Sequence, residues 1–164
     1  MVLTSPVEVI PDGDSVHRWV FAPRMWDAFQ NQLIWSGVWE FKRDHNCCES
    51  LVWDKYVSSV QGVHELGRAQ EKRKLEEKPG RDYRYVGFLS ANVGGIRAFH
   101  NARGHGFRVD HEPSEGIYHA HICFEPARGQ EFTRNDKSEL KLKLKDLFKE
   151  HSFQDNSLSN VDIS

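Results

Sequence analysis

The chain has 164 residues, of which 38% are hydrophobic and 28% are charged. A chain of this length typically forms one domain of about 100–200 residues, and its five Trp and ten Phe supply enough apolar material for a core. The 22 Lys and Arg against 24 Asp and Glu give a net charge of −2. That balance offers no general attraction to phosphate polymers, so nucleic acids are not expected partners.

Two other features of the composition concern location and redox state. No stretch approaches the roughly 18 apolar residues of a membrane span, and the N-terminus lacks the pattern of a secretory signal. We therefore expect a cytoplasmic protein with no membrane partner. The three cysteines, Cys47, Cys48 and Cys123, are an odd number that cannot all pair within one chain. We expect no disulfide framework.

The first part of the chain predicts an extended arm followed by core segments. Residues 1–14 contain two prolines and an Asp-Gly turn, which are typical of an arm without regular structure. Residues 16–21 are rich in Val, Trp and Phe and predict a strand. Residues 33–41 form a second apolar and aromatic stretch, which we also assign to the core.

The pattern changes in the next segment. Trp53, Tyr56, Val57 and Val60 follow the i, i+3, i+4, i+7 spacing that places four side chains on one face of a helix. We therefore predict a helix near residues 50–60.

A charged segment over 65–78, ended by Pro79-Gly80, predicts a second and exposed helix. Its basic residues are interleaved with glutamates at helical spacing, which indicates a solvated face, with phosphate binding as the alternative. The basic residues are Arg68, Lys72, Arg73 and Lys74.

The second half of the chain predicts three strands and a helix. Residues 84–89 indicate a buried strand, and residues 107–111 and 117–125 indicate two short strands whose turn-rich connection favours antiparallel pairing. The Lys- and Leu-rich segment 136–150 predicts a helix because Leu, Lys and Glu are strong helix formers.

These elements predict an α+β fold in a single domain of residues 1–153. We expect a small, mostly antiparallel sheet packed by two to three helices. The polar residues 154–164 are predicted to be a disordered tail.

Side chains that can take part in catalysis or metal binding are most concentrated around the segment 117–125. Because side chains alternate along a strand, Ala120 and its apolar neighbours would face the core, and His119, His121, Cys123 and Glu125 would share the other face. We name His119 and His121 as candidate catalytic residues. We also name His119, His121 and Glu125, or Cys123 in its place, as candidate ligands of a transition metal such as zinc. The alternative is a purely structural histidine cluster whose imidazoles are hydrogen-bonded to their neighbours.

Arg18 and His111 are two further candidate catalytic residues. Arg18 lies on the predicted first strand. Strict alternation would turn His111 toward the core with Phe107 and Val109, away from the other histidines, unless Pro113 breaks the alternation.

The sequence resembles a group of small uncharacterised bacterial proteins. The likeness is carried by His17-Arg18-Trp19-Val20, by Trp35-Ser36-Gly37 and by the stretch from Gly106-Phe107-Arg108 to Tyr118-His119-Ala120-His121. These proteins combine an Arg-containing first strand with a closing His-x-Pro…Ala-His strand, and the resemblance implies no established activity.

Two partial likenesses to other families concern function. The His-x-His pattern followed by Glu125 is similar to the first metal-binding motif of cupins, although Pro113 stands where a glycine is expected. An arginine on the first strand followed by a Ser-containing element resembles ADP-ribosyltransferase-like folds, which implies a glutamate among Glu49, Glu112 and Glu125.

Two main interpretations of function remain open at this point. The first is a small enzyme with a His-centred site that acts on a nucleotide or another phosphate-containing substrate. The second is a non-catalytic module that binds a protein partner through its charged helix, with the histidines in a structural role. A metal-binding protein without catalysis is a third.

Overall fold

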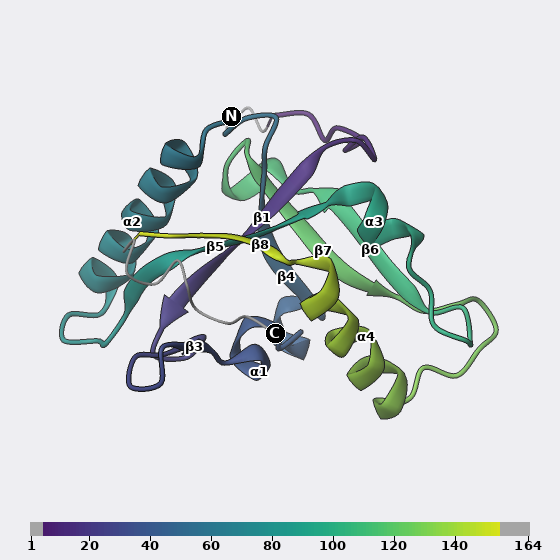
Figure 1. Cartoon of the computed structure of the whole chain (residues 1–164). Helices are drawn as coiled ribbons and strands as arrows, with labels where there is room; N and C mark the ends of the chain where they lie inside the picture. The colour runs from purple at the N-terminus through teal and green to yellow at the C-terminus, as the bar shows by residue number, and fades with distance from the viewer. Residues whose placement is uncertain (1–4, 155–164) are drawn as a thin grey trace.

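The computed structural model describes residues 5–154 and contains one six-stranded antiparallel sheet, a two-stranded sheet and four α-helices (Figure 1). The strand order of the large sheet is β6-β7-β4-β1-β5-β8. The predicted α+β fold with a small antiparallel sheet is confirmed. The elements are β1 (Ser15–Ala22), β2 (Trp26–Asp27), β3 (Gln32–Leu33), α1 (Trp35–Val38), η1 (Arg43–His45), β4 (Cys48–Trp53), α2 (Val60–Glu77), β5 (Arg84–Asn92), α3 (Val93–Ala98), β6 (Gly106–His111), η2 (Pro113–Glu115), β7 (His119–Glu125), α4 (Arg134–Leu147) and β8 (Glu150–Phe153).

The two faces of the large sheet have different partners. The apolar side chains of alternate strand positions face α1, α3 and α4 and form the main core, in which Trp39 packs against Phe148 and Phe41 stacks on Phe124. The opposite face carries α2, which lies over β5 (Figure 1). His64 of α2 reaches this face, where its ring nitrogens lie 2.9 Å from the Tyr85 and Ser152 hydroxyls.

The predicted helix near residues 50–60 is wrong. Residues 48–53 form β4, in which Leu51 and Trp53 belong to the core cluster, and α2 begins only at Val60. Its N-terminus is fixed by the Ser59 side chain, which accepts a hydrogen bond from the Gly62 N–H. The helical spacing that motivated the prediction was coincidental. Trp53 is the last residue of β4, which pairs with β1 and β7, whereas Tyr56 and Val57 lie in the turn after β4 and Val60 is the first residue of α2.

Most other elements are found where the sequence predicts them. The strands at 16–21, 84–89, 107–111 and 117–125 correspond to β1, β5, β6 and β7, and the charged segment belongs to α2. The last helix ends earlier than predicted, because the chain turns at Phe148 and continues as β8 along β5. The predicted tail falls almost entirely on residues 155–164, which lie outside the described residues.

The cysteine count led us to expect no disulfide framework, but the structure contains one disulfide. Cys48 of β4 lies directly opposite Cys123 of β7, with a Cα–Cα distance of 4.3 Å, and the two form a disulfide. This short distance is typical of the non-hydrogen-bonded pairs of an antiparallel ladder, where side chains approach most closely. Cys47 is therefore the one free thiol among the three cysteines.

Candidate functional site

A cleft lies between α2 and the part of the sheet formed by β4 and β7. Its larger hollow has a volume of about 790 Å³ and is lined by residues of η1, β4, α2 and η2 together with His121. A smaller hollow of about 160 Å³ is lined by residues of β1, β4 and α2 together with His119. Ser50, Gln70, Arg73 and Glu115 line both hollows, so the two adjoin, and we call them together the α2 cleft.

His119 and His121 reach this cleft because of the alternation along β7. Ala120, Ile122 and Phe124 belong to the core cluster, and the odd-numbered positions point to the face that carries α2. The prediction that the two histidines share the face opposite the core is therefore confirmed. Their rings are in edge-to-face contact, with centroids 4.8 Å apart.

The environment of His119 orients its ring. Its Nδ1 lies 3.2 Å from the Glu112 carbonyl oxygen, which can only accept, so Nδ1 carries the proton of this contact. Its Nε2 lies 3.5 Å from a carboxylate oxygen of Glu115, whose side chain is 70% exposed. Burial lowers the pKa of His119 below its usual value, and the neighbouring His121 lowers it further.

His121 has polar neighbours on both adjacent strands. Ser50 of β4 is its direct partner on one side and Asp110 of β6 its direct partner on the other. Directly opposed residues have Cβ atoms about 4.5–5.5 Å apart, so a hydroxyl and a carboxylate flank the imidazole. The sequence does not predict that Ser50, His121 and Asp110 lie side by side, because they come from three different strands.

His17 forms part of the wall of the smaller hollow. Its Nδ1 lies 2.7 Å from the Ser90 hydroxyl of β5, and its ring contacts Phe88 edge to face. Burial lowers the pKa of His17 to about 4. This imidazole is therefore neutral at pH 7, and it was not among the residues predicted from the sequence.

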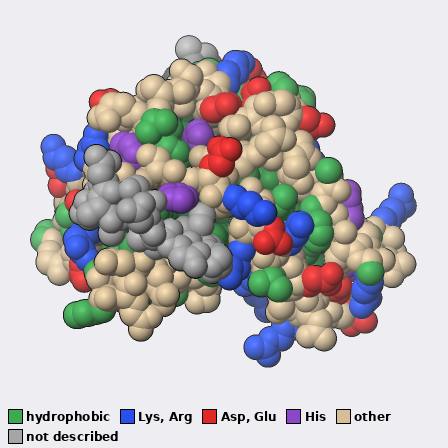
Figure 2. Space-filling view, viewed as in Figure 1, with side chains coloured by type: hydrophobic (Ala, Val, Ile, Leu, Met, Phe, Trp, Pro, Cys, Tyr) green, Lys and Arg blue, Asp and Glu red, His purple; other side chains and the backbone are tan. Residues whose placement is uncertain are grey.

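Arg73 supplies a positive charge from the α2 side of the cleft. Its guanidinium donates to the Gln70 side chain, and among residues 5–154 it makes no ion pair with a carboxylate. Lys74, which lines the larger hollow, is instead paired with Glu77 at 3.2 Å. On the face of the molecule in Figure 2, acidic and basic side chains are interspersed, in keeping with the small net charge.

Arg18 of β1 has a buried side chain whose partners are already in the protein. Its guanidinium is buried, donates to the Glu49 carboxylate at 2.8 Å and donates to the carbonyl oxygens of Val38 and Ser50 at 2.9 and 3.0 Å. Glu49 also accepts hydrogen bonds from the backbone N–H groups of Glu40 and Phe41. The Arg18 side chain therefore connects β1 to β4 and α1. Arg18 also lines the smaller hollow, but its guanidinium is already bound to Glu49 and to the two carbonyl oxygens.

His111 also faces the core side, as strict alternation along β6 requires. Its Nδ1 accepts a hydrogen bond from the Glu8 N–H at 3.0 Å, and its Nε2 lies 2.7 Å from the Ile117 carbonyl oxygen. Its ring packs edge to face on Trp53. Both nitrogens are used, and the Nδ1 contact fixes the N-terminal arm to the sheet. Of the four candidate catalytic residues, His119 and His121 have their rings in contact, and Arg18 lines the smaller hollow with His119 although its guanidinium is occupied by Glu49. His111 lines neither hollow.

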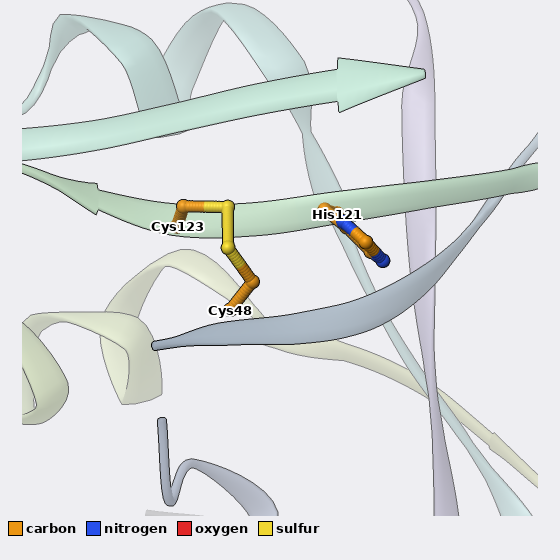
Figure 3. Close-up of side chains that lie close together, drawn as sticks. All are labelled: Cys48, His121 and Cys123. Carbon is orange, nitrogen blue, oxygen red and sulfur yellow. A yellow bond between two sulfur atoms is a disulfide. The ribbon is translucent and has the colours of Figure 1, made fainter. Parts of the chain in front are cut away.

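The candidate metal ligands are arranged differently from the predicted set. His121 and Glu125 are four positions apart on one strand, which separates their Cα atoms by about 13 Å. Among the described residues, the group of metal-competent side chains is Cys48, His121 and Cys123, whose ligand atoms all lie within 4.8 Å of one another (Figure 3). His119 and Glu125 are not members of this group. Cys48 was missed because 75 positions separate it from Cys123 in the sequence.

Comparisons with known proteins add no further information about this site. No protein-family model matches the chain, and neither the curated proteins nor the solved structures yielded a match. The resemblance to small bacterial proteins therefore stays a prediction. Within residues 5–154, no helix has both the length and the apolar character that crossing a membrane requires.

Proposed function

We propose that the α2 cleft binds a phosphate-bearing small molecule of the nucleotide class and that His119 acts on it as a general base. The observation that carries the proposal is the position of Arg73, which lacks a carboxylate partner among the described residues and lines the same hollows as His119 and His121. A guanidinium with free donors matches the geometry of phosphate oxygens.

The smaller hollow supports a ligand that also has a planar ring. Its walls include the aromatic side chains of Trp19, Tyr83 and Tyr118. Tyr83 is already stacked on Phe21, with centroids 4.5 Å apart and planes 14° from parallel, so its orientation is held by packing. Aromatic faces of this kind stabilise nucleobases by stacking, independently of base identity.

The orientation of His119 supports the role of general base. The Glu112 carbonyl holds the proton on Nδ1, which leaves Nε2 with the lone pair that accepts a proton. The nearest charged group to Nε2 is Glu115, whose side chain is largely exposed and can turn away when an anionic ligand enters. His121 lies beside His119 and provides a second donor or acceptor for the reacting group.

Binding is tested by thermal unfolding of the full chain with AMP, ADP-ribose, NAD and inorganic phosphate. A ligand at about 100 times its Kd stabilises the folded state by about 2.7 kcal/mol and raises Tm by several degrees. We expect a shift with at least one nucleotide for the wild type. Arg73→Gln should lose it, and Lys72→Gln, an exposed change on the same helix that lines neither hollow, should keep it.

Chemistry is tested separately by following the bound nucleotide by chromatography. His119→Gln should retain the ligand-induced shift and abolish conversion of the nucleotide. If no ligand shifts the wild type, the proposal is rejected and the interaction module becomes the leading interpretation.

A further inference from the structure

The Cys48–Cys123 pair and His121 form a group that the proposed function does not use as a whole. The two sulfurs are bonded between β4 and β7, and His121 is two positions before Cys123 on the same face of β7 (Figure 3). Each residue presents one metal-competent atom, and all three atoms lie within 4.8 Å of one another. Two sulfurs and an imidazole nitrogen are the ligands that Zn²⁺ prefers in proteins.

We propose that these three residues form a redox-gated zinc site. In the oxidised protein both sulfurs are consumed by the disulfide, and no thiolate is available as a ligand. In the reduced protein the same two sulfurs and the imidazole of His121 bind Zn²⁺. Disulfide formation and metal binding therefore exclude each other at Cys48 and Cys123.

The two cysteines can bind Zn²⁺ without a movement of β4 relative to β7. Tetrahedral Zn–S bonds of about 2.3 Å place two thiolate sulfurs about 3.8 Å apart. Directly opposed residues of an antiparallel pair have Cβ atoms about 4.5–5.5 Å apart, so two thiolates reach that separation by side-chain rotation. Five residue pairs from Cys48↔Cys123 to Val52↔His119 keep β4 and β7 aligned independently of the disulfide.

The surroundings supply an orienting group and an open coordination position. Asp110 lies directly opposite His121 on β6. One oxygen of its carboxylate is paired with Arg108, and the other can accept the imidazole N–H that the metal does not bind. Cys48 and His121 both line the larger hollow of the α2 cleft. The fourth position of the ion therefore faces the cleft and takes water or a ligand, the arrangement of catalytic rather than structural zinc sites.

Reduction of the Cys48–Cys123 disulfide makes the two sulfurs available to the metal ion. A dithiol reductant donates two electrons to the Cys48–Cys123 disulfide by thiol–disulfide exchange, becomes a disulfide itself and leaves two thiols on the protein. Zn²⁺ then replaces the two thiol protons, which are released to solvent. When an external disulfide accepts two electrons from the two thiolates and is itself reduced to two thiols, the Cys48–Cys123 bond forms again and Zn²⁺ is released.

The test compares metal binding by the oxidised and the reduced full chain. The protein is reduced with a dithiol, freed of the reductant without oxygen, and titrated with Co²⁺ and Zn²⁺. We expect one ion per reduced chain, the charge-transfer and tetrahedral ligand-field bands of a Co²⁺–thiolate centre, and no binding by the oxidised chain. Reduced protein that binds no ion, or oxidised protein that binds equally well, overturns the proposal.

Matched variants identify the ligands. Cys123→Ser and His121→Asn should each weaken Zn²⁺ binding at least about tenfold, whereas Cys47→Ser, which changes the neighbouring free thiol, should leave it unchanged. If Cys47→Ser abolishes binding, a different thiol pair holds the ion and the proposal fails.

Wild-type protein provides a check that needs no variant to fold. Zn²⁺ should protect Cys48 and Cys123 of the reduced chain from alkylation, while Cys47 stays reactive, as read by mass spectrometry. Equal alkylation of all three thiols with and without Zn²⁺ contradicts the site. Because none of these measurements uses a nucleotide, they separate this proposal from the function proposed for His119 and Arg73.

Discussion

The two faces of the sheet use the same residue types in opposite ways. On the core face, the Arg18 guanidinium is buried against Glu49 and two carbonyl oxygens, and both nitrogens of His111 have backbone partners. On the α2 face, Arg73 makes no ion pair among the described residues, and His119 uses only Nδ1 in a backbone hydrogen bond. A polar side chain with all its partners satisfied stabilises the fold, whereas one with unused donors or acceptors is available to a ligand.

The largest difference between the two faces is expected in the stability lost when Arg18 or Arg73 is replaced by alanine. Arg18→Ala leaves the buried Glu49 carboxylate without its cation and should lower the free energy of unfolding by about 3–5 kcal/mol. Arg73→Ala removes an exposed side chain and should change it by less than about 0.5 kcal/mol. Urea unfolding of both variants measures the contrast, and equal losses would show that the faces do not differ in this way.

The Cys48–Cys123 disulfide on the α2 face is expected to make the next largest contribution to the free energy of unfolding. The disulfide closes a loop of 75 positions, and its reduction should lower the free energy of unfolding by about 2–4 kcal/mol in metal-free buffer. Oxidised Cys47→Ser keeps the disulfide and serves as the control, with stability equal to that of the wild type. Identical unfolding curves for the oxidised and the reduced wild type would mean that the ladder alone holds β4 to β7.

His17 makes the α2 face sensitive to acid. Burial lowers its pKa to about 4, whereas an unfolded chain has the usual pKa of 6.5, so the unfolded state binds more protons between these values. Stability is therefore fully present above about pH 6.5 and falls as the pH drops toward 4, by up to about 3 kcal/mol from this residue.

The comparison with His17→Asn isolates this effect, because burial also lowers the pKa values of His64 and His119 and these groups add to the slope of the wild type. The variant should lose less stability than the wild type between pH 7 and pH 4.5 in urea unfolding. Parallel pH profiles of the two proteins would refute the role of His17.

The smallest contrast concerns one histidine from each face. His111→Asn should cost about 2 kcal/mol, because the Glu8 N–H and the Ile117 carbonyl both lose their partner. His119→Asn leaves only the Glu112 carbonyl without its partner and should cost about 1 kcal/mol. Thermal melts of the two variants decide the order, and a larger loss for His119→Asn would place it among the structural residues.

Several elements could be predicted because their signals are local. The alternation of residues 117–125 placed His119 and His121 on the face away from the core, and the charged segment of α2 has a helical composition and a Pro-Gly end. The helix predicted near residues 50–60 was wrong because a local spacing can also arise by chance. Pairing with β1 and β7 makes the first part of this segment a strand, and the rest is a turn that leads into α2.

The sequence by itself determined the fold class and the core face of β7, because both follow from local patterns such as the alternation of side chains along a strand. It left the direction of His111 dependent on whether Pro113 breaks the alternation. Tertiary structure decided which distant residues meet: Cys48 with Cys123, Ser50 and Asp110 with His121, and Arg73 with the histidine pair. These contacts depend on the strand order β6-β7-β4-β1 and on the position of α2 over the sheet. Both are set by long-range packing, which no local pattern encodes.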